Sequence, residues 1–512
     1  MSLDIIRAVL PKVPSLLTNT ASHLLSLNPY SQHWDFRTFA TVAILQSFLT
    51  SLEIHDRKGR VMTVEQVQAI AATDREIDDK TWVAKVSMPV EGVVSEEEML
   101  GLEGMVDRAV RELGVGMGMG GEDIQVNRAK VGREGLSGEW VGWRDAKKRG
   151  PHEKVKNGGE EWSEKRKWEA LNEDVGGFRE KEAQEGVVLW LHGGAYFVCD
   201  PITHRPMGKY ISKEFGGPVF LPRYRLAPQN PFPAAVVDAL VSYLYLLHPS
   251  SSLHSPYTPS QIFFGGDSAG GGLTLSLIQV LLWFQTPNSD GSKKTIRWMG
   301  KDIELALPKG LIIMSGWVEA ARCLPSEVSC ARGDYIPTPK QGSKSRYRQS
   351  EAWPADPPRT LFYADDTAIT HPLVSPVMAN SWEGCPPVWW CVGDECLRDS
   401  NLFFAHRLLT SSVPLHFEKY TNMPHVFPMI LSRNPTSACS FKSIGRFIKD
   451  HLGKTPYEYR RVRIHPKTLG MEELPEKELL FGGMTVERLR GFMEREVGAW
   501  KRKVRGKEGE AV

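Results

Sequence analysis

Between residues 187 and 420, short and continuously apolar runs alternate with longer segments of helical periodicity. The runs are VVLWL from residue 187, PVFLPRY from 218, QIFFGG from 261, GLIIM from 310, PVWWCVG from 387 and LHFEKY from 415. A strand that is apolar at every position is buried on both faces, which is typical of parallel sheets covered by helices. The sequence therefore predicts an α/β fold with a mostly parallel central sheet and helices on both faces.

The residues before residue 187 are predicted to form a helical segment and then further strands of the main domain. Residues 34–49 are apolar nearly all round, so we expect the helix they form to be buried against a larger body. Strands are predicted at residues 81–90 and 138–143, and Ser95 with Glu98 forms a capping box at the start of a helix. The predicted organisation is a helical segment at residues 1–80, a main domain at 81–453 and a C-terminal extension with a helix at 454–512.

One stretch of the predicted main domain has a different composition. Residues 144–186 are dense in Lys, Glu, Arg and Gly and contain few apolar side chains. Such a segment cannot bury a core of its own. We predict a polar, solvated insertion at this place.

Charge and cysteine content argue against several classes of function. The chain has 63 basic and 61 acidic residues, a net charge of +2, so no global field favours nucleic acid. Its seven cysteines lack CxxC spacing, as in most reduced intracellular chains, and we expect no metal site and no cofactor. The first residues lack the continuous apolar core of a signal peptide, and no apolar run reaches the roughly 18 residues that span a bilayer. The expected location is intracellular, either cytoplasmic or peripherally associated with a membrane.

Residues 266–270 (GDSAG) satisfy G-x-S-x-G and place Ser268 between an apolar run and a helical segment. A nucleophile on a sharp strand-to-helix turn brings backbone segments close together, so glycine is needed on both sides. The free N–H groups at the start of the following helix favour developing negative charge. The pentapeptide alone is a weak signal, but its context indicates that Ser268 is a nucleophile.

A second glycine-rich segment, His192-Gly193-Gly194, follows directly after the run VVLWL. When a serine hydroxyl adds to a carbonyl group, the oxygen becomes an anion that backbone N–H groups stabilise. We expect the donors to be the N–H groups of Gly193 and Gly194, together with that of Ala269 after the serine. The alternative is a turn that uses the two glycines for geometry alone, with a structural His192.

An acid and a base are expected after the serine in the chain. Asp394 and Glu395 follow the run PVWWCVG, at a strand end where parallel sheets present functional groups. His425 follows the run LHFEKY, in a loop after a late strand, whereas other late histidines fall within predicted helices or strands. One helix and one strand fit between Glu395 and His425, as neighbouring positions in a sheet require. Ser268, His425 and one of the two carboxylates therefore form a predicted catalytic triad.

These motifs resemble the hormone-sensitive-lipase-like family of α/β hydrolases, which contains esterases and lipases with HGG and GDSAG segments. The matching segments, in the family's order, are LHGGAYF, YRLAPQNPFPAAVVDAL, GDSAGGG, HPLVSPVMA, GDECLRD and MPHVF. The resemblance covers residues 187 to about 450 and implies the α/β-hydrolase fold. It also implies hydrolysis of a hydrophobic or short-acyl carboxylic ester, a small-molecule substrate, through an acyl-enzyme on Ser268.

The chain departs from the family's pattern in three segments. The usual DPLRD is ECLRD here, so the matching acid is Glu395, with Asp394 as the possible alternative. The usual HGGG is HGGA, which keeps both predicted donor glycines, and SPW is SGW. The resemblance further implies a helical cap over Ser268, formed by the N-terminal helices and an insertion at residues 317–375.

Other functions stay compatible with the sequence. The family includes non-catalytic ligand-binding members, although the presence of His425 favours an enzyme. A deacetylase of steryl acetates or other lipids at a membrane surface is another alternative, because residues 485–505 form a helix with apolar and basic side chains. Packing of this helix on the body of the protein explains the same pattern and is the preferred interpretation. An amide hydrolase or a dehydratase with the same pocket is a further alternative that the triad does not separate.

Overall fold

The computed structural model describes residues 22–23, 25–50, 55–56, 59–88, 93–116, 119, 136–145, 147, 156–157, 160–161, 163–176, 186–249, 253–338, 347–356, 358–453 and 455–508. The start of the predicted N-terminal segment, at residues 1–21, lies outside this part of the chain. So do much of the predicted polar insertion at 144–186 and residues 339–346 of the predicted cap insertion.

A single large sheet forms the centre of the described chain. Its ten strands, in spatial order, are β1 (Thr81–Ser87), β2 (Ser137–Trp143), β6 (Val219–Arg223), β5 (Val187–Leu191), β7 (Ile262–Asp267), β10 (Gly310–Met314), β11 (Val388–Gly393), β12 (Leu415–Tyr420), β13 (Arg461–Ile464) and β14 (Met471–Glu473). The strands from β6 to β13 are parallel, while β1, β2 and β14 pair in antiparallel fashion. Two short hairpins lie apart from it: β3 (Lys156–Asn157) with β4 (Glu160–Glu161), and β8 (Ile296–Trp298) with β9 (Lys301–Ile303).

Every apolar run singled out in the sequence is a strand of this sheet. All residues of β5, β7, β10 and β11 are buried. Side chains that alternate along a strand reach opposite faces, so Phe263 and Phe264 of β7 belong to two different core clusters. The prediction of a mostly parallel sheet covered on both sides is therefore confirmed.

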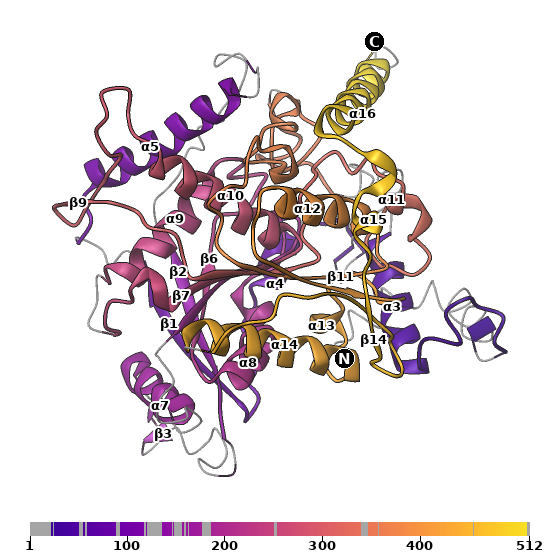
Figure 1. The fold of residues 1–512 in the computed structure, drawn as a ribbon, viewed down its shortest axis with the longest axis horizontal. Coiled ribbons are helices and arrows are strands. Elements are labelled where there is room, and N and C mark those ends of the chain that lie inside the picture. The colour runs from indigo at the N-terminus through magenta and orange to yellow at the C-terminus, as the bar shows by residue number, and fades with distance from the viewer. Residues whose placement is uncertain are drawn as a thin grey trace.

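Helices cover both faces of the sheet (Figure 1). One face carries α5 (Glu96–Val115), α9 (Ala234–Leu247), α10 (Ala269–Gln285) and α12 (Arg398–Thr410). The other carries α8 (Pro201–Phe215), α13 (Phe427–Ile430) and α14 (Pro435–Leu452). Short connecting elements are α11 (Ser326–Ser329), α15 (Glu476–Leu479) and 3-10 turns at Pro259–Gln261, Asp366–Ala368, Pro376–Met378 and Phe481–Gly483.

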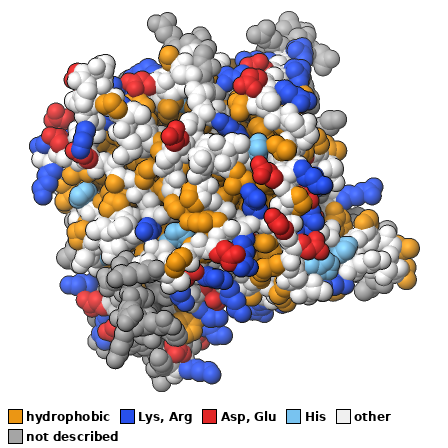
Figure 2. All heavy atoms as spheres, in the orientation of Figure 1, with side chains coloured by type: hydrophobic (Ala, Val, Ile, Leu, Met, Phe, Trp, Pro, Cys, Tyr) orange, Lys and Arg blue, Asp and Glu red, His pale blue; other side chains and the backbone are white. Residues whose placement is uncertain are grey.

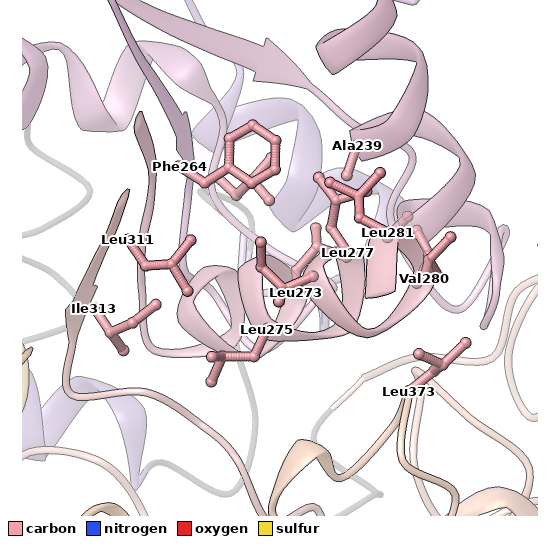
Figure 3. Close-up of a cluster of buried hydrophobic side chains, with 14 of the residues drawn as sticks. Ala239, Phe264, Leu273, Leu275, Leu277, Val280, Leu281, Leu311, Ile313 and Leu373 are labelled. Carbon is pink, nitrogen blue, oxygen red and sulfur yellow. The ribbon is translucent and has the colours of Figure 1, made fainter. Parts of the chain in front are cut away.

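Helix α10, which begins directly after the predicted nucleophile, is anchored in the core. Figure 3 shows its Leu273 and Leu277 beside Phe264 of β7 and Leu311 of β10. All four side chains are fully buried, and each such burial contributes roughly 1.5–3 kcal/mol to folding. The start of α10 is therefore fixed relative to the strand ends on either side.

The N-terminal helices α3 (Phe36–Leu49) and α4 (Val64–Ala71) pack on loops at the strand ends. Just before α3, the indole Nε1 of Trp34 donates to the carbonyl oxygen of Asn422 at 2.6 Å. In α4, the amide Nε2 of Gln68 donates to the carbonyl oxygen of Phe197 at 2.8 Å. The two helices thus contact the loops after β12 and β5, which supports the predicted role of the N-terminal segment in a cap.

The predicted polar insertion contains a helix that packs on the sheet. Helix α7 (Glu164–Gly176) buries Trp168 and Leu171, and the Trp168 ring lies 4.3 Å from the Trp140 ring of β2. The prediction of a solvated segment is wrong for this helix. Its few apolar residues are grouped on one side, where they bury on the sheet, while the average composition of the segment is polar.

The predicted C-terminal extension contributes strands to the central sheet. Strand β13 pairs in parallel with β12, and β14 pairs with β13, so the sheet continues past the predicted boundary at residue 453. Helix α16 (Val486–Glu508) then buries Leu489 and Met493 in the same core cluster as α10. The preferred interpretation of the tail helix, packing on the body, agrees with this burial.

The surface carries both signs of charge. On the face drawn in Figure 2, Lys and Arg side chains lie interspersed with Asp and Glu side chains. Of the helices in the described ranges, none has the length and apolar character needed to cross a membrane.

Candidate active site

Ser268 lies on the turn between β7 and α10, with φ 51° and ψ −121°, a conformation that side chains rarely adopt. The flanking glycines leave no room for a side chain. A Cβ atom at Gly266 would lie 2.3 Å from the carbonyl oxygen of Gly270, and one at Gly270 would lie 2.0 Å from that of Leu191. The steric reason for G-x-S-x-G that the sequence suggested is therefore present here.

The main chain of Ser268 is held from the neighbouring strand end. Its N–H donates to the carbonyl oxygen of Met314 at 2.9 Å, and its carbonyl oxygen accepts the N–H of Trp317 at 2.7 Å. Ser268 is partly exposed, whereas Asp267 and Ala269 on either side of it are buried. The turn thus presents the serine and hides its neighbours.

The structure brings His425 and Glu395 together. The imidazole Nδ1 lies 2.8 Å from Oε1 of Glu395, and both residues are buried. Because a carboxylate only accepts hydrogen bonds, Nδ1 carries the proton and Nε2 is left to accept another. The second oxygen of Glu395 accepts the hydroxyl of Ser315 at 2.6 Å and the N–H of Gly393 at 3.2 Å. A carboxylate with these partners orients the ring and favours its charged form.

The pKa of His425 is raised above its ordinary value of 6.5. Burial alone would lower this pKa, because it disfavours the imidazolium, but the charge and hydrogen bond of Glu395 raise it by more. Asp334 and Asp267 add smaller contributions in the same direction. The histidine is thus set up to take a proton and to be stabilised once it has done so.

Asp394, the alternative acid, faces a different group of residues. Its Oδ2 accepts the N–H of Asn422 at 2.9 Å, and its Oδ1 lies 3.4 Å from the Lys419 ammonium and 3.7 Å from the Arg398 guanidinium. These contacts tie together the ends of β11 and β12. The structure therefore pairs His425 with Glu395 and gives Asp394 a structural role.

Gly193, one of the three expected oxyanion donors, does not present a free N–H group. Its N–H donates to Oδ1 of Asp267 at 3.2 Å, which argues against the role expected for it. Gly194 and Ala195, with φ of 105° and 52°, turn the chain sharply after it. Within the described residues, no protein acceptor lies in hydrogen-bonding distance of the N–H groups of Gly194 and Ala195. The free donors of this loop are therefore shifted by one residue along the chain.

The carboxylate of Asp267 anchors the glycine-rich loop. Besides Gly193, its buried carboxylate accepts the indole Nε1 of Trp190 at 3.0 Å and lies 3.3 Å from Nε2 of His204. His192 is structural: its Nδ1 donates to the Gly193 carbonyl oxygen at 2.7 Å, and its ring stacks on Tyr224 at 4.2 Å. Burial lowers the pKa of His192 to about 4, so its ring stays neutral.

Sequence reasoning missed three polar groups that support the site. Ser315 links Glu395 to the N–H of Val426, which its oxygen accepts at 3.1 Å. Its position at the end of β10, between the serine and acid strands, was the available signal. Asp267 stands inside the GDSAG motif, but nothing in the sequence named its partners. Asp334 belongs to the predicted cap insertion and follows no motif.

Within the described residues, no group of three or more His, Cys, Asp or Glu side chains is placed to hold a metal ion. The site residues described above instead offer backbone N–H donors, the imidazole of His425 and the carboxylate of Glu395 that pairs with it. This set suits attack on a carbonyl carbon by a hydroxyl group.

Comparison with known proteins places this fold and site in a class. Residues 188–429 match the family described as the α/β hydrolase fold. These residues hold the serine turn, the glycine-rich loop, the acid and the base. The chain therefore has the α/β-hydrolase fold over these residues.

Its relatives narrow the class further. An acetyl-hydrolase of Streptomyces hygroscopicus is 27% identical over 273 residues, which are 53% of this chain and 78% of that protein. Lipase 2 of a Moraxella species is 26% identical, over 49% of this chain and 57% of the lipase. The carboxylic ester hydrolase LipN of Mycobacterium tuberculosis is 24% identical, over 52% of this chain and 64% of LipN. The chain is thus similar to carboxylic ester hydrolases and lipases.

Solved structures are also similar to this chain. EstE5 has a TM-score of 0.48 at 20% identity, covering 80% of this chain and 98% of its own. An esterase of the bacterial hormone-sensitive lipase family has a TM-score of 0.44 at 23% identity, covering 70% of this chain and 99% of its own.

Proposed function

We propose that this protein hydrolyses carboxylic esters with Ser268 as nucleophile, His425 as base and Glu395 as the acid that orients the base. The observation that carries the proposal is the 2.8 Å contact between His425 and Glu395. These residues follow β11 and β12, which lie two and three positions along the sheet from β7, the strand that precedes Ser268. The positive φ and partial exposure of Ser268 support its role.

The chemistry follows the order of proton transfers. The Ser268 hydroxyl adds to the ester carbonyl carbon while Nε2 of His425 takes its proton. The imidazolium, stabilised by Glu395, then gives this proton to the departing alcohol, and an acyl group stays on the serine. Water attacks the acyl-enzyme by the same route, which releases the carboxylic acid and restores Ser268.

The oxyanion donors in this proposal are the N–H groups of Gly194, Ala195 and Ala269. The first two lie in the glycine-rich loop without a protein acceptor, and the third lies at the N-terminus of α10. Donors at a helix N-terminus favour negative charge. Gly193 takes a supporting place, since Asp267 already accepts its N–H.

The substrate class in the proposal is a small ester with a hydrophobic or short acyl group. A relative of this chain is named an acetyl-hydrolase, which makes acetyl and butyryl esters the first to test. Hydrolysis rates over a series of p-nitrophenyl esters of increasing chain length measure the acyl preference. Falling kcat/KM with chain length would support the short-acyl form, and rising kcat/KM would favour a lipase-like substrate.

The membrane-bound lipid deacetylase is less well supported. Of the apolar side chains of α16 on which it depended, Leu489, Met493 and Val497 are buried against the protein, and Val486, Phe492 and Trp500 are half-buried. A chain with Lys501→Ala and Arg502→Ala, which removes exposed positive charge from α16, and the wild type should therefore sediment equally with anionic liposomes. Loss of association in the variant would revive the membrane alternative.

Loss of hydrolysis in one variant tests the proposal as a whole. The Ser268→Ala variant should fold, bind substrate and lose kcat by a factor on the order of 10⁶, because the nucleophile is absent. A non-catalytic binding protein would show no hydrolysis even in the wild type. Equal hydrolysis by both proteins would reject Ser268.

A further inference from the structure

A buried carboxylate outside the proposed triad touches both loops that carry its acid and its base. Asp334 is fully buried, and its Oδ1 accepts the N–H of His425 at 3.1 Å. Its Oδ2 accepts the N–H of Cys396, the residue after Glu395, at 2.8 Å. One side chain thus joins the loop after β11 to the loop after β12.

The segment that carries Asp334 is itself fastened to the acid loop. The Ser326 hydroxyl donates to the carbonyl oxygen of Cys396 at 2.6 Å, and the Ser326 N–H donates to Oδ2 of Asp399 at 2.8 Å. These contacts come from α11, a few residues before Asp334. The carboxylate is therefore held by its own segment as well as by the groups it binds.

Helix α3 covers the other side of this segment. Tyr335, next to Asp334, packs in a cluster with Trp34, Phe39 and Val42, and its ring lies 5.9 Å from the His425 ring. The cluster excludes water from Asp334. In such surroundings hydrogen bonds and charges act more strongly than they do in solvent.

We propose that Asp334 is a positioning residue of this site: it fixes the Glu395 and His425 loops relative to each other and places a second negative charge beside the imidazole. The inference rests on the hydrolase function proposed above. Its hydrogen bonds set the place of the ring relative to Ser268. Its charge stabilises the imidazolium that forms when Ser268 loses its proton.

The charges that face the two groups are few. The imidazole faces Glu395, Asp334 and Asp267. Asp334 also faces the buried ion pair of Arg322 with Glu327. Burial and the charge of Glu395 raise the pKa of Asp334, while His425 opposes this rise. Removing the charge of Asp334 is therefore expected to lower the pKa of His425.

The test is the Asp334→Asn variant, which keeps the shape of the side chain but loses its charge and one acceptor oxygen. With p-nitrophenyl butyrate, kcat should fall by about tenfold or more while KM stays within about threefold, because the charge acts mainly in the transition state. The acid limb of the kcat/KM profile should also move to lower pH. Asp238→Asn is the matched control, since Asp238 is also buried and accepts a backbone N–H, from Arg225 at 2.7 Å, away from the site.

The outcomes of this test either support or reject the positioning role of Asp334. A folded Asp334→Asn protein whose acid limb coincides with that of the wild type and of Asp238→Asn would overturn the proposal, whatever its kcat. If Asp334→Asn does not fold, Asp334→Glu keeps the charge but displaces it: a reduced kcat with an unmoved acid limb supports the role, and a wild-type kcat rejects it. Wild type and Ser268→Ala are assayed in parallel. An inactive wild type would reject the hydrolase function itself. If the wild type is active and Ser268→Ala is inactive, the Asp334 variants test the positioning role of Asp334 alone.

Discussion

At the scale of single residues, the choice between two adjacent carboxylates is the sharpest prediction. Glu395→Gln should lower kcat by a factor on the order of 10³ to 10⁴, because the imidazole loses its orientation and its charged partner. Asp394→Asn should change kcat less than about fivefold, because partly exposed ion pairs contribute about 1 kcal/mol or less. Steady-state kinetics of the two variants on one ester make the comparison. A larger fall of kcat in Asp394→Asn than in Glu395→Gln would make Asp394 the acid of the triad.

The raised pKa of His425 predicts the pH dependence of the enzyme. The base acts only when neutral, so kcat/KM should fall as pH drops through a midpoint above the ordinary value of 6.5. Glu395→Gln removes the main cause of the rise, so the residual activity should have its acid midpoint at lower pH. A midpoint that stays in place in this variant would contradict the role of Glu395 in charging the ring.

Asp267 offers a test of the oxyanion loop. In Asp267→Asn one acceptor becomes a donor, so the carboxylate contacts to Gly193, Trp190 and His204 cannot all persist. Displacement of the donors on Gly194 and Ala195 should lower kcat by about ten- to a hundredfold with little change in KM, since the oxyanion forms only in the transition state. Single-ester kinetics measure this, and a proportional rise of KM would show lost substrate binding instead.

Some of these residues could be found in the sequence and others could not. Ser268, Glu395 and His425 were predictable because each directly follows an apolar strand run, and the ends of parallel strands meet. The hydrogen bond of Gly193 could not be predicted, because it joins Asp267 across 74 positions of the chain. Asp334 reaches His425 across 91 positions from a segment without a motif.

At the scale of elements, helix α16 is predicted to stabilise the fold. Leu489 is fully buried in the cluster that includes α10. Leu489→Ala should lower the free energy of unfolding by about 2–5 kcal/mol, because it leaves a cavity. Lys501→Ala, on the exposed side of the same helix, should change it by less than about 0.5 kcal/mol. Urea unfolding compares the two, and equal values would show that the helix is not packed as described.

The central strands were predictable, while elements such as β13 and α7 were not. Apolar runs identified β5, β6, β7, β10, β11 and β12, since a strand buried on both faces has such a run. Strand β13 has the sequence RVRI, in which buried residues alternate with half-buried arginines, so it produced no apolar run. Helix α7 was missed because its buried residues, Trp168, Ala170 and Leu171, are few among many charges.

At the scale of the whole molecule, the central sheet includes strands that follow residue 453, where the end of the main domain was predicted. Removal of residues 454–512 would expose the edge of β12 and the apolar surface under α16, and such edges promote association. The shortened chain should lose its cooperative thermal transition or aggregate, as seen by light scattering. A monomeric shortened chain with an unchanged Tm would establish residues 454–512 as an independent extension.

The proposed function of the whole protein depends on Ser268 being an activated nucleophile. A fluorophosphonate probe reacts with serine hydroxyls that a neighbouring base has activated, and peptide mass spectrometry locates the adduct. We predict a single adduct on Ser268, greatly slowed in His425→Ala and absent in Ser268→Ala. An adduct on a residue other than Ser268 would contradict the proposed function. So would ester hydrolysis that persists in Ser268→Ala although this variant forms no adduct.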